Sequence, residues 1–202
     1  MNDESSQLEQ IPIVSCFQHN LLDLLLLAHK SAFLADFDVS FNDHSISCHK
    51  CLLTPFSERM SSLVAKNLDS YEIDALEEAT CDDFDAIISS FYGKALEITS
   101  ENSLGIFLLS KSLKYKELST KAQTVIKSTA GVTHKLPLES IMETLKSDNF
   151  KYHTIIFQDK SLQIHKFLFA AISPYFKTKF SQKWQESEDN FTDFTEFLKV
   201  SP

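Results

Sequence analysis

The sequence predicts a mixed α/β protein of the α+β type, in which a small mixed sheet is flanked by a cluster of helices and the unit is repeated in tandem. Three observations support this prediction. Two segments alternate apolar with polar residues in a hairpin pattern, each is followed by a continuously apolar helical stretch, and the two segments align without a gap. With 43% apolar residues and 17 phenylalanines among 202 residues, the chain can build a core.

The repeat joins residues 38–60 to residues 154–176 at an offset of 116 positions. Seven of the 23 aligned pairs are identical, and about half of the others exchange one apolar residue for another. The identical pairs are Phe41/Phe157, Asp43/Asp159, Ser45/Ser161, His49/His165, Lys50/Lys166, Leu52/Leu168 and Ser57/Ser173. This period is too long for a solenoid unit, so we interpret it as a domain copied in tandem.

Each copy begins with a predicted hairpin that leads into a buried helix. In the first copy, residues 38–41 alternate, residues 42–45 are turn formers, and residues 46–48 alternate again. The apolar run at residues 51–53 is too dense for an exposed strand and favours a buried helix. The second copy repeats this order over residues 155–172.

The rest of the first copy is predicted to hold short strands and further helices. Residues 71–73 are a candidate strand. Thr80 and Asp83 have the spacing of a capping box, and Gly93 is placed to end the helix that they begin. A short strand at residues 96–98 and two more helices complete the unit.

These elements divide the chain into four segments. Residues 1–19 are expected to be a disordered tail and lead-in, and residues 20–126 the first unit with its N-terminal helix, here called copy one. The small residues and Pro137 of the stretch 127–137 are typical of a linker. Residues 138–202 form the second unit, copy two, which is C-terminally truncated and does not align beyond about residue 190. Either the chain is a fragment or copy two is vestigial.

Composition excludes several classes of protein. With 19 basic and 28 acidic residues, the net charge of −9 disfavours nucleic acid and anionic membranes as partners. Three glycines cannot form a phosphate-binding glycine loop. The acidic start MNDESSQLEQ differs from a targeting leader, and the apolar stretch 21–28 is too short to span a bilayer. The four cysteines are expected to be free thiols in a reducing cytoplasm or nucleus.

No catalytic or metal-binding constellation is evident in the sequence. There is no nucleophile elbow, no His-Glu-x-x-His motif and no paired carboxylates, so we expect no enzymatic activity, cofactor or small-molecule substrate. Cys48, His49 and Cys51 have a metal-like spacing, but the repeat places Ile164 and Phe167 at the two cysteine positions. These cysteines are therefore predicted to fill core positions. Stoichiometric zinc in a metal analysis of the protein would revive the hypothesis of a metalloenzyme or hydrolase.

The order of these motifs resembles the BTB/POZ domain. The matching segments are Asp38-Val39, His49-Lys50, Phe91-Tyr92-Gly93 and Leu96-Glu97-Ile98-Thr99 in copy one, and His165-Lys166 and Ser173-Pro174-Tyr175-Phe176 in copy two. The resemblance covers about residues 20–126 and 138–190. Copy one departs from the pattern at residues 56–60, where Ser-Pro-x-Phe is expected, and copy two has Thr154 in place of the aspartate.

The resemblance implies an interaction module without catalytic activity of its own. Many members self-associate through the helix that precedes the first strand, many bind cullin scaffolds, and others recruit corepressors. The chain is thus expected to be an intracellular protein–protein adaptor in the cytoplasm or nucleus, with a cullin-type ubiquitin ligase as the specific hypothesis. The alternative is a homo-oligomerising scaffold or a transcription-related BTB protein without a ligase link.

Apolar residues almost encircle the helix predicted at residues 20–34, whereas a helix that covers a single core needs only a stripe. The self-association candidates on it are Leu21, Leu24, Leu25 and Ala28. Its second apolar face calls for a second partner, either the same helix of another subunit or the second repeat of the same chain. The alternative is simple burial in one unit.

Two further candidate sites follow from the resemblance. Phe180, Trp184 and Glu186 are placed like the hydrophobic-x-Glu motif of cullin-binding members, with an aromatic anchor and an orienting carboxylate. The alternative is that Trp184 packs locally and Glu186 is solvated. Asp38 and Lys50 are candidates for a charged pocket, whereas the alternative gives the His-Lys pair a structural role at the turn into the helix.

Overall fold

Copy one is built around a three-stranded mixed sheet. The computed structural model describes residues 13–146, 153–157, 160–181 and 190–195. Strands β1 (Phe37–Phe41) and β2 (His44–Cys48) form the expected antiparallel hairpin, and β3 (Ser70–Ile73) lies parallel to β1 on its other side. The order β2-β1-β3 confirms the predicted small mixed sheet.

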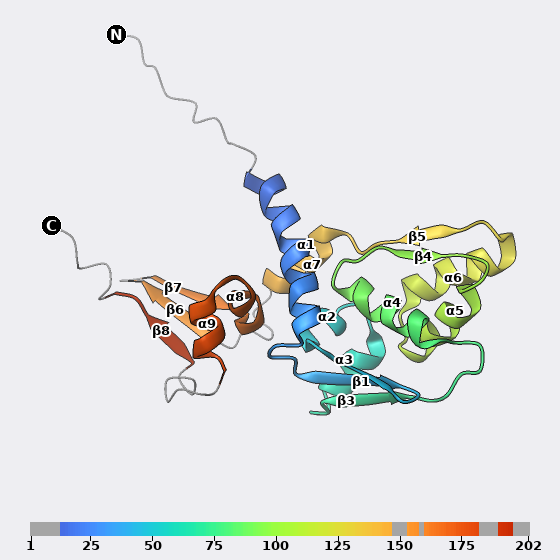
Figure 1. Ribbon diagram of the computed structural model, residues 1–202, viewed down its shortest axis with the longest axis horizontal. Helices are drawn as coiled ribbons and strands as arrows, with labels where there is room; N and C mark the ends of the chain where they lie inside the picture. Colours follow the sequence, from blue (N-terminus) through green and yellow to red (C-terminus); the bar gives the residue numbers. More distant parts are fainter. Residues whose placement is uncertain (1–12, 147–152, 158–159, 182–189, 196–202) are drawn as a thin grey trace, which may run out of the picture.

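Helices pack against one face of this sheet, because Val39 and Phe41 of β1 are buried while Asp38 is exposed (Figure 1). The helices of this part of the chain are α1 (Ile13–Ser31), α2 (Lys50–Leu53), α3 (Glu58–Val64), α4 (Cys81–Phe91), α5 (Ser103–Ser112) and α6 (Lys116–Ser128). The predicted capping box is confirmed at the start of α4, since Thr80 Oγ1 accepts the backbone N–H of Asp83 at 3.1 Å. The ring of Phe84 in α4 lies 5.9 Å from that of Phe41, so α4 closes the core over the sheet.

Copy two repeats the sheet of copy one with the same pairing. Strands β6 (His153–Phe157) and β7 (Lys160–Ile164) form the expected hairpin, and β8 (Phe191–Asp193) lies parallel to β6 in the order β7-β6-β8. Phe37 pairs with Cys48 in the first hairpin, and the residues 116 positions later, His153 and Ile164, pair in the second. The repeat therefore extends to a third strand, one that the sequence alignment does not reach.

The helices that follow the two hairpins also correspond. Copy two contains α7 (Leu138–Lys146), α8 (Lys166–Ile172) and α9 (Pro174–Lys179). Ser57 accepts the backbone N–H of Met60 at the start of α3, and its counterpart Ser173 accepts that of Phe176 in α9. The same short-range chemistry thus begins the equivalent helix in each copy. The core of copy two is small and consists of Ile155, Ile164, Ala170, Phe176 and Phe180.

The segment 127–137, expected to be a linker, is structured. Its residues Val132–His134 form strand β5, which pairs antiparallel with β4 (Leu96–Ile98). Thr133 Oγ1 also donates to the Glu97 carboxylate, at 2.8 and 2.9 Å to its two oxygens. The strand has three residues and its partner is distant in sequence, so neither periodicity nor a hairpin turn marks it. Ile141 of the following helix α7 is fully buried in the core of copy one.

Among the described residues, no helix combines the length and apolar character needed to cross a bilayer.

Candidate interaction surfaces

The two repeated histidines hold the start of a helix to the end of the preceding one. His49 Nε2 bonds the carbonyl of Phe33 at 3.1 Å, and His165 Nε2 bonds the carbonyl of Leu145 at 3.0 Å. Phe33 follows α1 and Leu145 lies in the last turn of α7, so each histidine bonds a carbonyl near the end of the helix that precedes its hairpin. This is the local structural role that the sequence offered as the alternative to a charged pocket.

His49 is buried and its other polar groups are satisfied by a single hydroxyl. The hydroxyl of Tyr92 lies 2.9 Å from His49 Nδ1 and accepts the backbone N–H of His49 at 3.0 Å. Burial lowers the pKa of His49, because the imidazolium would lose its hydration. A neutral ring that donates from Nε2 and accepts at Nδ1 fits all these contacts.

The residues proposed for a charged pocket do not pair with each other. Asp38 Oδ1 accepts the hydroxyl of Ser47 at 2.6 Å on the exposed side of the hairpin, and no ion pair joins Asp38 to Lys50, both of which lie in the described part of the chain. The carboxylate beside Lys50 is Asp36, which accepts the backbone N–H of Lys50 at 2.7 Å. Asp36 was not expected from the sequence, because its position depends on the backbone course after α1.

Lys50 and its counterpart Lys166 line one cavity, of about 440 Å³, between the copies. Asp36, His49 and Phe167 also line it. Charged and aromatic residues from both copies therefore line this crevice between the two units.

The self-association candidates on α1 face the core of copy one. Leu21 and Ala28 are buried and Leu25 is 0% exposed, all three within that core, while Leu24 is half-buried. These three side chains are therefore occupied within the chain. Helix α1 also contacts α8 of copy two, and Leu27 lines a cavity together with residues of α8, which is the intrachain alternative considered above.

The cullin-binding candidates are only partly within the described residues. Phe180 is 4% exposed and belongs to the core of copy two, where its ring stacks on Phe176 with centroids 5.6 Å apart. Lys166 Nζ lies 5.6 Å from the centroid of the same ring. Phe180 is thus a core residue and not a surface contact. Trp184 and Glu186 lie outside the described residues.

Copy two exposes apolar side chains at positions where copy one packs the equivalent side chains against its core. Leu162 lies on the core face of its sheet, because it pairs with the buried Ile155, yet it is 54% exposed. Its counterpart Ile46 is half-buried against the core of copy one. Ile172 is 53% exposed, whereas its counterpart Phe56 stacks on Phe91 of α4 with centroids 6.3 Å apart. Among the described residues of copy two no helix takes the place of α4.

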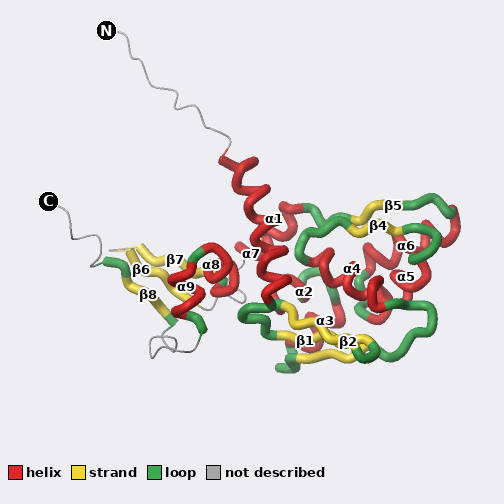
Figure 2. Tube along the Cα trace, viewed as in Figure 1, coloured by secondary structure: helices red, strands yellow, loops and turns green. Residues whose placement is uncertain are grey.

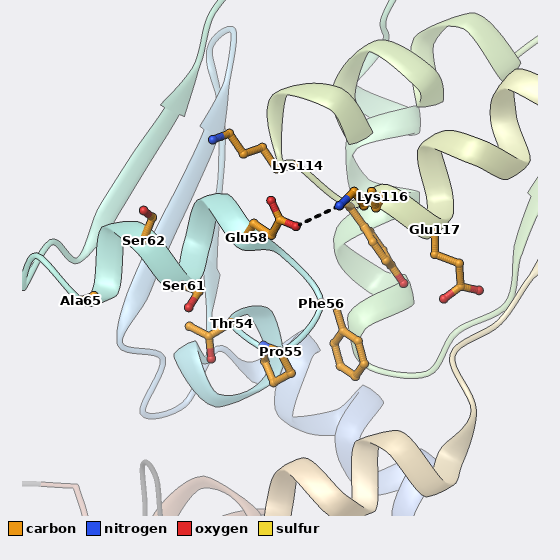
Figure 3. Close-up of a pocket in the computed structure, with 11 residues that line it drawn as sticks. Thr54, Pro55, Phe56, Glu58, Ser61, Ser62, Ala65, Lys114, Lys116 and Glu117 are labelled. Atoms are coloured by element: carbon orange, nitrogen blue, oxygen red, sulfur yellow. Dashed lines mark ion pairs between the residues drawn. The ribbon is translucent and has the colours of Figure 1, made fainter.

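A groove on copy one lies between α3 and the turn that joins α5 to α6 (Figure 3). Its two walls are tied together, since Ser57 Oγ donates to the Leu113 carbonyl at 2.6 Å. Glu58 and Lys116 form an exposed ion pair across it, with 3.7 Å between Oε1 and Nζ. Phe56 adds an aromatic ring at one end. Sequence reasoning missed this groove because the turn between α5 and α6 carries no motif.

The described residues hold no group of three or more His, Cys, Asp or Glu side chains that could bind a metal ion. Cys48 and Cys51 are buried thiols, and burial raises the pKa of both well above the ordinary value. They lie in the copy-one core, as the repeat predicted.

Comparison with known proteins identifies a family whose sequence pattern the chain matches. The family model of the BTB/POZ domain matches residues 21–130 and 142–201, two segments that contain the two hairpin units. The BTB domain of zebrafish PATZ1 is similar at 22% identity and a TM-score of 0.45, over 61% of this chain and 99% of that one. The BTB domain of human Gigaxonin is similar at 16% identity and a TM-score of 0.42, over 54% of this chain and 92% of that one. No curated protein matches the chain.

BTB domains are in general interaction modules without enzymatic activity. The family model covers more than half of the chain, and the structure has the mixed α+β architecture expected from the sequence. The chain belongs to the BTB/POZ domain family.

Proposed function

We propose that this protein is a non-enzymatic adaptor that joins other polypeptides, and that copy two contacts a cullin scaffold of a ubiquitin ligase. The observation that carries the proposal is the open core face of copy two. Leu162 and Ile172 are more than half exposed there, and an apolar face of this kind gains from being covered by another protein. The proposed site of action is the cytoplasm or nucleus, which suits the free thiols Cys48, Cys51 and Cys81.

The cullin hypothesis assigns the contact to residues near α9. Tyr175 on α9 is exposed, and the motif Trp184-x-Glu186 follows a few residues later in the sequence. In this proposal the indole fills an apolar pocket on the scaffold and the carboxylate accepts hydrogen bonds at its rim. Phe180, which precedes this motif in the sequence, is a core residue of copy two.

The test is binding of the full chain to a purified cullin N-terminal domain, measured by calorimetry. Trp184→Ala and Glu186→Ala should each weaken binding by about tenfold or more, since truncation of an anchoring residue costs ~2 kcal/mol. Leu104→Ala is the matched control, because Leu104 is exposed on α5 in copy one. Unchanged affinity of both variants would remove the Trp184-x-Glu186 motif from the cullin contact, while no binding of the unmodified chain would remove the ligase link altogether.

The alternative, a homo-oligomerising scaffold, requires a free apolar face on α1. Leu21, Leu25 and Ala28 are not free, because they lie in the core of copy one. Light scattering distinguishes the two functions, since a scaffold that works by self-association would form dimers or larger species at micromolar concentration.

A further inference from the structure

The two copies contact each other through equivalent helices in a reciprocal way. Helix α1 precedes the hairpin of copy one and contacts α8, which follows the hairpin of copy two. Helix α7 precedes the hairpin of copy two and contacts α2, which follows the hairpin of copy one. Figure 1 shows α1 and α7 together at the junction of the two units, and Figure 2 shows the same arrangement along the chain trace. In both contacts, the helix that precedes the hairpin of one copy packs against the helix that follows the hairpin of the other copy.

The centre of the contact is formed by residues at equivalent positions. The ring of Phe167, the first apolar residue of α8, stacks on His49 with centroids 4.2 Å apart. His165, the counterpart of His49, lies edge-on to the same Phe167 ring, with centroids 5.8 Å apart. An approximate two-fold axis between the copies would pass close to these two histidines.

Each copy also contributes side chains to the core of the other. Phe167 and Ile141 of copy two are buried in the core of copy one, and Leu168 packs against it. In the other direction, Phe33 and Leu34, which follow α1, pack against the core of copy two. Both copies therefore contribute apolar side chains to the contact between them.

From these observations we infer that the two copies form an intramolecular pseudo-dimer. Copy two occupies the faces of α1 and α2 that a second chain would otherwise need, so the protein is a monomer whose self-association surface is satisfied from within. The inference goes beyond the adaptor function and does not depend on it, because no cullin takes part in the contact.

The experiment is a crosslink across the cavity between α1 and α8. Leu27 of α1 and Ala171 of α8 both line this cavity, and Leu27 is 49% exposed, so substitution there leaves the core intact. The full chain carries Leu27→Cys and Ala171→Cys together with Cys16→Ser and Cys81→Ser, while the buried Cys48 and Cys51 remain. A short bismaleimide is applied to an equal mixture of isotopically light and heavy protein, followed by mass spectrometry.

We expect a crosslink at the mass of one chain, 23.0 kDa, in which light and heavy peptides are not mixed. Mixed light–heavy crosslinks would show that α1 pairs with α8 of another chain, which overturns the inference. No crosslink, with both cysteines reactive toward a monofunctional maleimide, would also overturn it, because the copies would then be apart. Leu104→Cys with Ala171→Cys is the control that should not crosslink, since α5 lies far from α8 (Figure 1).

Discussion

The imidazole of His49 in copy one stacks on the ring of Phe167 in copy two, with centroids 4.2 Å apart and an interplanar angle of 28°. This stack is a direct contact between the two copies. Neither residue is equivalent to the other in the repeat, because the counterpart of Phe167 is Cys51. Copy two thus supplies the large ring at a position where copy one holds a small thiol. This asymmetry lets one aromatic stack form at the contact between the two copies.

Phe167→Ala should destabilise the whole chain. The substitution removes the stack on His49 and leaves a cavity in the core of copy one, and such truncations cost about 3 kcal/mol. The free energy of unfolding is measured with urea. Leu162→Ala is the control, because Leu162 is exposed on β7 and its loss should cost about 0.5 kcal/mol or less. Equal losses for the two variants would show that the stack does not hold the copies together.

The stability of the protein should fall as the pH falls below about 6.5. Burial lowers the pKa of His49, His29 and His134 in the folded chain, so the unfolded chain takes up protons first. Their contribution is complete above the ordinary histidine pKa and is lost as the pH falls through the folded values. Urea unfolding at several pH values between 5 and 8 measures it. His49→Gln should reduce this pH dependence without abolishing it; an unchanged dependence would contradict the burial of a neutral His49.

Gly93→Ala should be strongly destabilising. Gly93 ends α4 with φ of 87°, a left-handed conformation that costs other residues about 1–2 kcal/mol. An added Cβ would also collide with the side chain of Leu22 in α1. Gly131→Ala is the matched control, because a Cβ there would meet only the Ile98 carbonyl, at 3.3 Å. Thermal unfolding of both variants is the measurement, and a larger loss for Gly131→Ala would contradict the packing of α1 on Gly93.

The equivalent capping serines should differ in importance. Ser173→Ala removes one cap from α9 and should cost about 1 kcal/mol. Ser57→Ala removes the cap of α3 and also the bond from Ser57 Oγ to the Leu113 carbonyl, so a buried acceptor is left unsatisfied and the loss should be about twofold larger. Urea unfolding compares the two. Equal losses would show that the second bond contributes nothing.

Local sequence patterns predicted the elements that depend on local interactions. The hairpins follow from alternation in sequence, and the start of α4 follows from Thr80 and Asp83, whose bonds span three residues. Strand β5 was missed because the small residues and Pro137 around it are typical of a linker, and β8 was missed because it lies beyond the point where the two copies align in sequence.

The candidate sites were predicted less well, because exposure depends on packing between distant segments. Phe180 was predicted to be a surface anchor but lies in the core of copy two. Leu25 was predicted to be an interface residue but is fully buried in the core of copy one. Asp36 replaces Asp38 as the carboxylate beside Lys50, since the turn after α1 decides which aspartate points toward α2. The need of α1 for two apolar partners was predicted from its near-complete ring of leucines, and the contact with α8 provides the second.

Leu34 packs against the cores of both copies, so neither core is complete when the other unfolds. Copy two has only a few buried apolar residues of its own and gains much of its support from this shared boundary. The two halves should therefore melt together in a single cooperative transition, and a small second domain can persist in the chain without being independently stable.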